Sequence, residues 1–224
     1  MADGLAAEII GALALRERGP VGDRPRLVAA MITSLDGRIA VGGRSLGLGH
    51  PDDRALLRGL REGADAVLVG ASTIRAERYA KLFDGDARPL IAIASRSGDV
   101  PWEVGLFREP DSRVVVYTGT DVEIPGDVTA QVEVRRNDDG PAAMLRDLRA
   151  RDGVDLVSCE GGPRLLRSIA ADGALDDLML TLAPLLVAGP QLTMLSGGDL
   201  EPPLALALRR TWRSDDHLFL HYAP

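Results

Sequence analysis

The turn with the clearest chemical potential lies between a short apolar run and an apolar helical pattern. It reads Cys159-Glu160-Gly161-Gly162-Pro163-Arg164-Leu165-Leu166. Its two glycines tolerate positive φ and leave no side chain in the way of a phosphate, and a proline suits the first turn of a helix. A helix N-terminus also presents unpaired N–H groups. The turn therefore predicts a cradle for a dinucleotide pyrophosphate, with an ordinary strand-to-helix turn as the alternative.

Two further turns place hydroxyl groups directly after apolar runs. In Gly70-Ala71-Ser72-Thr73, either hydroxyl can cap the next helix or donate a hydrogen bond to a cofactor. In Ser95-Arg96-Ser97, a guanidinium between hydroxyls suits the 2′-phosphate that distinguishes NADPH from NADH, unless the segment is simply a solvated turn. The chain has no G-x-G-x-x-G fingerprint, which disfavours a standard Rossmann dehydrogenase.

Asp36 and Glu160 are the candidate proton-handling groups. Burial of either carboxyl would raise its pKa towards the working pH, which general acid–base catalysis requires. Each can instead accept hydrogen bonds from a heterocycle, and Asp36-Gly37 also suits a tight turn that needs no substrate. His217 and His221 flank an apolar triplet typical of an edge strand and have no evident third partner, so we predict no metal site.

The composition argues against several classes of protein. A net charge of -7 disfavours a nucleic-acid or anionic-membrane surface. Cys159 is the only cysteine, so no internal disulfide can form, which fits a reducing cytoplasm. The longest apolar stretch, residues 178–189, contains Pro184 and is too short to predict a membrane span. We expect a soluble, cytoplasmic protein.

The elements that position these turns are short strands alternating with helices. Apolar runs predict strands over residues 27–33, 66–69, 90–94, 114–117 and 156–158. Periodic apolar residues predict helices over 52–62, 141–151 and 163–170. This alternation indicates a largely parallel sheet, and the later runs 178–183, 204–208 and 217–222, which lack crossover helices, indicate an antiparallel edge. Ligands of such sheets bind beyond the carboxyl ends of the strands.

The N-terminal residues form an element of their own. Leu5, Ile9, Ile10 and Leu13 recur at helical spacing and predict an amphipathic helix. A stretch rich in proline and glycine, residues 18–25, follows it. We therefore expect a helix and connector over residues 1–25 and a single domain over residues 26–224.

Three segments, taken in order, resemble the riboflavin-pathway pyrimidine reductase family, the reductase domain of the bifunctional deaminase/reductase. They are Ser34-Leu35-Asp36-Gly37-Arg38-Ile39-Ala40, Ala64-Asp65-Ala66-Val67-Leu68-Val69-Gly70-Ala71-Ser72-Thr73 and Glu160-Gly161-Gly162-Pro163. The resemblance spans about residues 26–222. It implies an α/β fold, the dihydrofolate reductase-like three-layer α/β/α sandwich, and a homodimer. It also implies NADPH-dependent reduction of 5-amino-6-(5-phosphoribosylamino)uracil to the ribitylamino product in riboflavin biosynthesis.

The resemblance assigns roles to individual residues. Asp36 and Glu160 would be catalytic. Ser45, Arg61 and Lys81 would bind the heterocyclic substrate. The cofactor-binding set would be Gly70, Ser72, Thr73, Glu77, Ser95, Arg96, Gly161, Gly162, Pro163, Arg164, Leu165 and Leu166.

The sequence departs from the family pattern at three points. Ala30 stands where the family often has a lysine. The family's D-D-P-x-L-T-x-R segment, with its phosphate-binding arginine, is replaced by residues 77–82, where Lys81 or Arg78 would substitute. A zinc-deaminase signature is missing, so only the reduction step is expected. A reductase of a dihydropterin or dihydrofolate-like heterocycle and a noncatalytic nucleotide-binding protein remain the alternatives.

Overall fold

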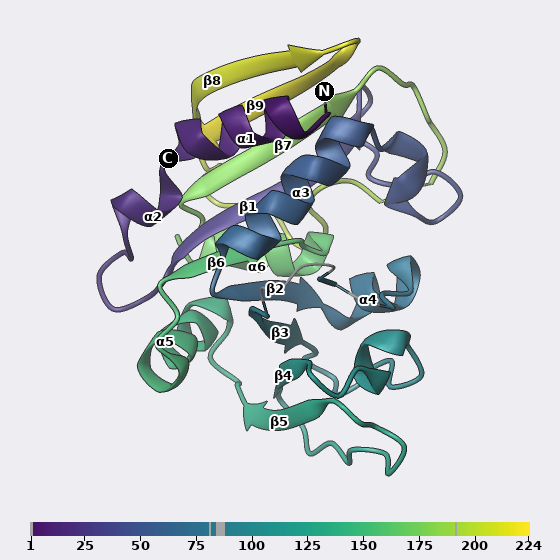
Figure 1. Ribbon diagram of the computed structural model, residues 1–224, viewed down its shortest axis with the longest axis vertical. Coiled ribbons are helices and arrows are strands. Elements are labelled where there is room, and N and C mark those ends of the chain that lie inside the picture. Colours follow the sequence, from purple (N-terminus) through teal and green to yellow (C-terminus); the bar gives the residue numbers. More distant parts are fainter. Residues whose placement is uncertain (1, 81, 84–87, 191) are drawn as a thin grey trace.

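A central sheet organises the chain in the computed structural model, which describes residues 2–80, 82–83, 88–190 and 192–224 (Figure 1). Within these residues the sheet has nine strands, in the order β5-β4-β3-β2-β6-β1-β7-β9-β8. Their bounds are β1 Arg26–Ser34, β2 Ala66–Gly70, β3 Leu90–Ala94, β4 Arg113–Thr118, β5 Gln131–Arg136, β6 Leu156–Cys159, β7 Asp177–Ala183, β8 Ala207–Ser214 and β9 His217–Ala223.

The sheet is parallel from β5 to β7 and antiparallel from β7 through β9 to β8. Apolar runs formed the expected strands β1, β2, β3, β4, β6, β7 and β9, with ends that agree to within one residue. The predicted α/β class, with a largely parallel sheet and an antiparallel edge, is confirmed.

Helices cover both faces of the sheet (Figure 1). They are α1 Ala2–Leu13, α2 Leu15–Arg18, α3 Pro51–Gly63, α4 Ala71–Glu77, α5 Pro141–Asp152 and α6 Pro163–Ala171, with short 3-10 turns at Ser45–Leu48 and Gly105–Arg108. On one face α5 and α6 bury Leu145 and Ile169 against Leu68. On the other, α1 and α3 cover one half of the sheet, and α4 covers the half around Val67. Because residues 67 and 68 alternate across a strand, these are opposite faces of a three-layer α/β/α sandwich.

The N-terminal helix α1 packs directly on α3. Ile9 and Leu13 of α1 are buried with Leu60 of α3 and Phe219 of β9. Gly59 allows a close approach, since a Cβ there would lie 2.3 Å from Cδ1 of Ile10. The predicted amphipathic helix is confirmed, and α1 lies beside α3 on the same face of the sheet (Figure 1).

The two edge strands were not placed correctly from the sequence. The run 204–208 was expected to be a strand, whereas β8 comprises Ala207–Ser214. No strand was expected where β5 lies, at Gln131–Arg136. Both strands are largely exposed and rich in arginine, so neither presents a continuous apolar run. No helix in the described part of the chain has the length and apolar character to cross a membrane.

Candidate active site

The turns that follow β2 and β6 touch each other at the carboxyl edge of the sheet. The backbone N–H of Gly70 donates to the carbonyl of Gly161 at 2.8 Å. A Cβ on Gly162 would lie 2.6 Å from Oγ1 of Thr73, so the second turn has no room for a side chain there. Gly161 has φ +77°, in the left-handed region, and its peptide bond to Gly162 is cis. Two of the three turns selected from the sequence therefore form one surface.

A cleft of about 200 Å³ opens at this surface. It is bounded by β1 and β7 on the sheet, by α3 and α4, and by the start of α6. The residues expected in the site that line it are Ser45, Ser72, Thr73, Glu77, Glu160, Gly162 and Pro163. The structure thus brings together predicted residues from three separate segments of the chain.

The carboxylate of Glu160 is fixed at the cleft by two neighbours. Its side chain is 3% exposed, and Arg61 of α3 donates to it from Nε at 2.5 Å and from Nη2 at 2.7 Å. The hydroxyl of Tyr79 donates to Oε2 of Glu160 at 2.7 Å. The two hydrogen bonds from Arg61 and the third from Tyr79 hold the carboxylate in one orientation. Glu160 is therefore a rigid anionic group beside the glycine turn.

Arg61 and Tyr79 have perturbed proton affinities as a result. Burial alone would lower the pKa of Arg61, but the charge of Glu160 and its hydrogen bonds raise that pKa above its ordinary value. Burial, followed by the Glu160 carboxylate, raises the pKa of Tyr79. Both residues keep their protons at neutral pH. The guanidinium also lies over the Tyr79 ring, 5.4 Å from its centroid.

Arg61 and Tyr79 thus act on the site in ways that the sequence did not indicate. Arg61 was expected to contact substrate, yet it does not line the cleft and reaches the site through Glu160. Tyr79 lines the cleft. It lies in the segment 77–82, in which we expected Glu77 to bind the cofactor and Lys81 or Arg78 to bind phosphate. No local pattern marks its contact with Glu160.

Asp36 lies outside the cleft, in the turn after β1. Its carboxylate accepts hydrogen bonds from the Ser34 hydroxyl at 2.6 Å and from the N–H groups of Val187 and Ala188 at 3.0 and 2.7 Å. These bonds lower its pKa to about 2, with Ser34 making the largest contribution. Proton transfer by Asp36 required a raised pKa, so its surroundings favour the alternative turn-forming role.

Ser45 and Glu77 are tied to each other across the cleft mouth. The backbone N–H of Ser45 donates to Oε1 of Glu77 at 2.8 Å. Arg44 donates to the Glu77 carbonyl at 2.9 Å, and its Nε lies 3.9 Å from the carboxylate. Glu77 therefore anchors Arg44 and Ser45, in the segment between β1 and α3.

Ser72 and Thr73 do not cap α4. The N-cap of that helix is Gly70, with no side-chain cap, and both hydroxyl residues lie inside the first turn. The capping interpretation is wrong, because the helix begins at Ala71. Both side chains face the cleft instead.

The remaining expected residues lie around the cleft or away from it. The Ser95 hydroxyl donates to the carbonyl of Asp99 at 3.1 Å. Arg96 is exposed in the turn that follows β3, the strand next to β2. Arg164 is exposed on α6, whereas Leu165 and Leu166 pack into the core, so only their backbone can face a ligand. Lys81 lies outside the described residues.

Asp53 is a cleft residue that the sequence analysis missed. It lies in the first turn of α3 and lines the cleft together with Thr181 of β7. Burial raises the pKa of its carboxyl, against a hydrogen bond from Thr181 and the charges of His217, Arg54 and His50. Acidic residues are common at helix N-termini because they complement the dipole, so Asp53 gave no distinct signal.

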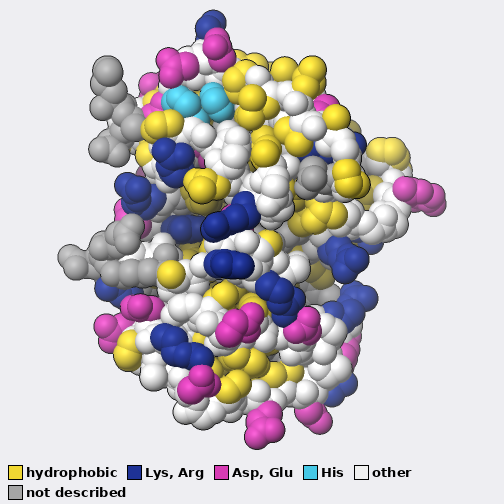
Figure 2. Space-filling model, turned by 90° about the vertical axis from the view of Figure 1, so that its right-hand side faces the viewer, with side chains coloured by type: hydrophobic (Ala, Val, Ile, Leu, Met, Phe, Trp, Pro, Cys, Tyr) yellow, Lys and Arg dark blue, Asp and Glu magenta, His cyan; other side chains and the backbone are white. Residues whose placement is uncertain are grey.

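The face that carries the cleft is rich in basic side chains. Figure 2 views the edge of the sheet where β2 ends, the right-hand side of Figure 1, and shows arginine side chains across its middle. The whole chain is acidic, with a net charge of -7, so this local excess of positive charge suits an anionic ligand such as a phosphate ester.

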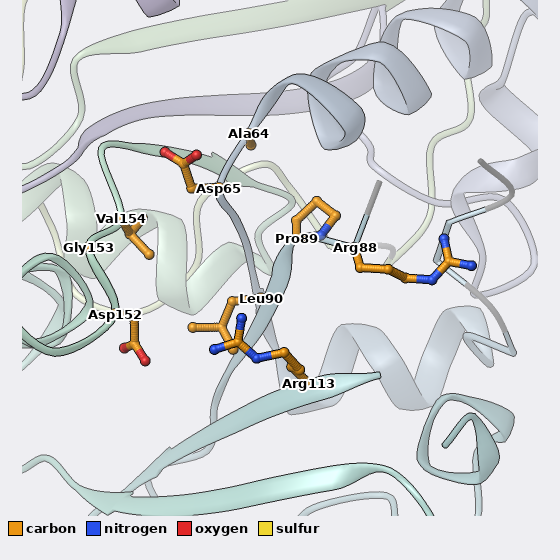
Figure 3. A pocket seen from close by; sticks show the side chains of 9 residues that line it. All are labelled: Ala64, Asp65, Arg88, Pro89, Leu90, Arg113, Asp152, Gly153 and Val154. Atoms are coloured by element: carbon orange, nitrogen blue, oxygen red, sulfur yellow. The ribbon is translucent and has the colours of Figure 1, made fainter. Parts of the chain in front are cut away.

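A second hollow, of about 340 Å³, lies at the opposite edge of the sheet, where β2, β3 and β4 begin (Figure 3). Its two carboxylates already have partners: Asp65 accepts from Arg16 at 2.9 Å, and Asp152 accepts from Arg135 at 2.6 Å. The Arg88 side chain points away from both (Figure 3). Because ligands of open α/β sheets bind at the carboxyl ends, the first cleft is the candidate site.

Comparison with known proteins gives one consistent result. The model of the RibD C-terminal domain family matches residues 25–220. The 2,5-diamino-6-ribosylamino-4(3H)-pyrimidinone 5′-phosphate reductase of Methanothermobacter thermautotrophicus is 23% identical over 214 residues, covering 89% of this chain and 98% of the relative. The riboflavin biosynthesis protein RibD of Mycobacterium tuberculosis is 30% identical over 172 residues, covering 74% of this chain but 44% of the relative.

A solved structure shares the fold. The diaminohydroxyphosphoribosylaminopyrimidine deaminase/5-amino-6-(5-phosphoribosylamino)uracil reductase of Thermotoga maritima superposes with a TM-score of 0.76 at 24% identity. The match covers 90% of this chain and 57% of that chain, so this chain spans little more than half of the bifunctional protein. Since the family model covers nearly the whole length and the dihydrofolate reductase-like architecture agrees, the chain belongs to the RibD C-terminal domain family.

Proposed function

We propose that this chain is an NADPH-dependent reductase that acts on a phosphoribosylamino-pyrimidine of riboflavin biosynthesis. One observation carries the proposal: a buried carboxylate, held by Arg61 and Tyr79, lies immediately before a side-chain-free glycine turn in the same cleft. The names of the relatives support the same reaction, because two of them are called reductases of such pyrimidines.

The β6–α6 turn suits the phosphate groups of a nicotinamide dinucleotide. A Cβ at position 162 would fill the space beside Thr73, so the glycine keeps the approach to the helix N-terminus open. The N–H groups at the start of α6 and the hydroxyls of Ser72 and Thr73 would hold the phosphates. The exposed Arg96 would bind the 2′-phosphate of NADPH. When bound, NADPH supplies a hydride from nicotinamide C4 to the substrate.

The reaction requires one hydride and one proton. Opening of the ribosylamine ring gives an imine between the sugar C1′ and the amino nitrogen. The hydride adds to C1′ and the proton to nitrogen, which leaves the ribitylamine. Glu160 would orient the substrate by accepting a hydrogen bond from it, and Arg61 and Tyr79 would prevent the carboxylate from rotating away.

The second candidate is reduction of a dihydropterin or dihydrofolate-like heterocycle. Asp53 favours it, because a carboxylate lies at the end of the cleft bounded by α3 and β7. Ala30, which stands where the family often has a lysine, also lines the cleft.

The oligomeric state and location follow the family resemblance. We propose a cytoplasmic homodimer, supported by five leucines between residues 185 and 208 that are 36–79% exposed. Exposed apolar patches commonly mark protein interfaces. Sedimentation equilibrium of the purified protein measures the mass directly, and a monomer at micromolar concentration would reject the dimer.

The reaction is tested by following NADPH oxidation with the phosphoribosylamino-pyrimidine as substrate. NADH and dihydrofolate serve as controls. Turnover with the pyrimidine and a preference for NADPH over NADH are expected. Turnover only with dihydrofolate would transfer the assignment to the second candidate, and tight NADPH binding without any turnover would reject a reductase.

A further inference from the structure

The two sides of the cleft differ in chemistry. The side formed after β2 and β6 carries hydroxyls, the glycine turn and Glu160. The side formed by α3 and β7 carries Asp53 and Thr181 among the apolar side chains of Leu56, Leu57 and Met179. Strand β1 separates β6 from β7 in the sheet, so these are distinct ends of one cleft. Apolar walls with a carboxylate at one end suit a flat heterocycle that presents its polar edge to Asp53.

Asp53 differs in its pairing from Glu77 and Glu160, the other acidic residues that line the cleft. The carboxylate of Glu160 is paired with Arg61, and that of Glu77 accepts the Ser45 N–H and lies near Arg44. Among the described residues, no arginine or lysine lies within salt-bridge distance of Asp53. Burial raises the pKa of its carboxyl, and besides Thr181 its charged neighbours are His217, Arg54 and His50. Asp53 is half-buried, and a carboxylate that a bound ligand would bury further is costly unless N–H donors satisfy its oxygens.

The chemistry of the ring edge decides which pyrimidine provides those donors. A 2-amino-4(3H)-pyrimidinone presents its 2-amino group and its N3–H side by side, which matches the two oxygens of a carboxylate. A uracil presents a carbonyl oxygen in place of the 2-amino group, and a carboxylate facing that oxygen is unfavourable. We infer that Asp53 selects a substrate with the 2-amino-4-oxo pyrimidine edge. This inference takes the reduction itself from the proposed function, whereas the choice of ring depends on Asp53.

This selection places the reaction in a sequence. The 2-amino group takes no part in reduction at C1′, so it remains on the product. A hydrolytic deamination of the ring would then consume the product of this enzyme, instead of supplying its substrate. The 2-amino-4-oxo edge is shared by the diaminopyrimidinone and by dihydropterins, so the two sources need separate arms of the test.

The test compares kcat/KM for two phosphoribosylamino-pyrimidines that differ only at C2, amino against oxo. The wild type is expected to prefer the 2-amino substrate by at least about tenfold, since one matched polar pair is worth at least that factor. Asp53→Asn is expected to lower this ratio by about tenfold or more, because its amide can donate to a C2 carbonyl. Equal turnover of both substrates, or a preference for uracil, by the wild type would overturn the inference.

Asp52→Asn is the matched control. Asp52 is the neighbouring residue in the same helical turn, but its carboxylate accepts from the Ser214 hydroxyl at 2.5 Å and does not line the cleft. The preference for the 2-amino ring should therefore survive in this variant. An equal change of the ratio in Asp52→Asn and Asp53→Asn would reject a specific role for Asp53.

Binding of ring fragments tests Asp53 independently of turnover. Titration calorimetry with 2,5,6-triaminopyrimidin-4-one and with 5,6-diaminouracil should show tighter binding of the first by the wild type and loss of that difference in Asp53→Asn. Discrimination between the fragments without reduction of either full substrate would reject the proposed function and support Asp53. Turnover with dihydrofolate alone would support Asp53 and the second candidate. Reduction without discrimination would support the function and reject Asp53.

Discussion

Glu160 is the residue on which the site most depends. Its carboxylate accepts from both Arg61 and Tyr79 while it lines the cleft. Breaking a buried ion pair at one partner is much more costly than the pair is stabilising, because the remaining charge stays buried. A substitution of Glu160 that removes its charge should therefore reduce both activity and stability.

Glu160→Gln is expected to lower the free energy of unfolding by about 3 kcal/mol, since it leaves the Arg61 guanidinium, 16% exposed, without its anion. We also expect kcat/KM for the pyrimidine to fall by about 100-fold or more. Urea denaturation and NADPH oxidation measure the two effects. Glu133→Gln is the control: Glu133 is 47% exposed and Arg135 keeps Asp147 and Asp152, so a loss below about 1 kcal/mol is expected. Equal losses would contradict the argument.

Substitution of Gly162 tests whether the β6–α6 turn binds the cofactor. In Gly162→Ala the new Cβ would lie 2.6 Å from Oγ1 of Thr73, so the turn or Thr73 must move. We expect the Kd for NADPH to rise about tenfold or more, equivalent to about 1.4 kcal/mol, as measured by titration calorimetry. Gly63→Ala, where no atom lies within 4 Å of the new Cβ, should bind NADPH like the wild type. Unchanged affinity in Gly162→Ala would place the phosphates elsewhere.

Asp36 makes a pH-dependent contribution to stability. Its folded pKa is lowered from 3.8 to about 2, so the charged form favours the folded state. The contribution is fully present above pH 3.8 and is lost as the pH falls through 2. Asp36→Asn should therefore lower the Tm at neutral pH, and the difference from the wild type should shrink between these two values. If the Tm difference between wild type and Asp36→Asn stays constant as the pH falls to about 2, the assigned hydrogen bonds from Val187 and Ala188 are contradicted.

Sequence patterns identified the site residues whose positions depend on local structure. Ser72, Glu160 and Gly162 directly follow strands, and parallel strands bring such residues to one edge. Asp53 and Tyr79 could not be found in this way. Their roles depend on how α3 and the segment after α4 pack over the cleft, which no local spacing encodes.

At the scale of elements, the close packing of α1 on α3 depends on a glycine. Gly59 faces Ile10 across the helix pair, whereas a Cβ added at Gly11 of α1 would have no atom within 4 Å. Alanine is favoured over glycine inside a helix by about 1 kcal/mol. The two positions thus separate helix propensity from packing.

Gly11→Ala is expected to raise the free energy of unfolding by about 0.5–1 kcal/mol. Gly59→Ala should fall short of that gain or destabilise the protein, because Cδ1 of Ile10 must move from 2.3 Å. Urea denaturation of both variants gives the comparison. The same stabilisation in both would show that α1 and α3 are less closely packed than this contact requires.

The edges of the sheet explain why two strands escaped prediction. Interior strands such as β2 are buried on both faces and show continuous apolar runs. The edge strands β5 and β8 have exposed arginines, in Gln131–Arg136 and Ala207–Ser214, which discourage pairing with other chains. The apolar run 204–208 lies mostly before β8, so hydrophobicity marked the wrong segment.

At the scale of the whole molecule, the N-terminal residues are tied to the core by more than one contact. Arg18 donates to the buried Asp177 at 2.6 Å, and Arg24 donates to Asp176 at 2.6 Å. Trp212 of β8 donates to Glu8 of α1 at 3.1 Å. Because α1 packs against α3, and α3 carries both Asp53 and Arg61, the packing of α1 bears on the cleft.

Substitution of Ile9 tests how strongly α1 is coupled to the rest of the fold. It is 0% exposed, so Ile9→Ala is expected to lower the free energy of unfolding by about 2–5 kcal/mol through lost burial and the cavity that remains. Ile124→Ala, at a side chain 39% exposed, should change it by less than about 0.5 kcal/mol. If residues 1–25 and 26–224 unfold together, calorimetry of Ile9→Ala will show one transition at a lower temperature. A separate early transition, with the main transition unmoved, would show that the N-terminal helix is an independent unit and that α3 holds the cleft without it.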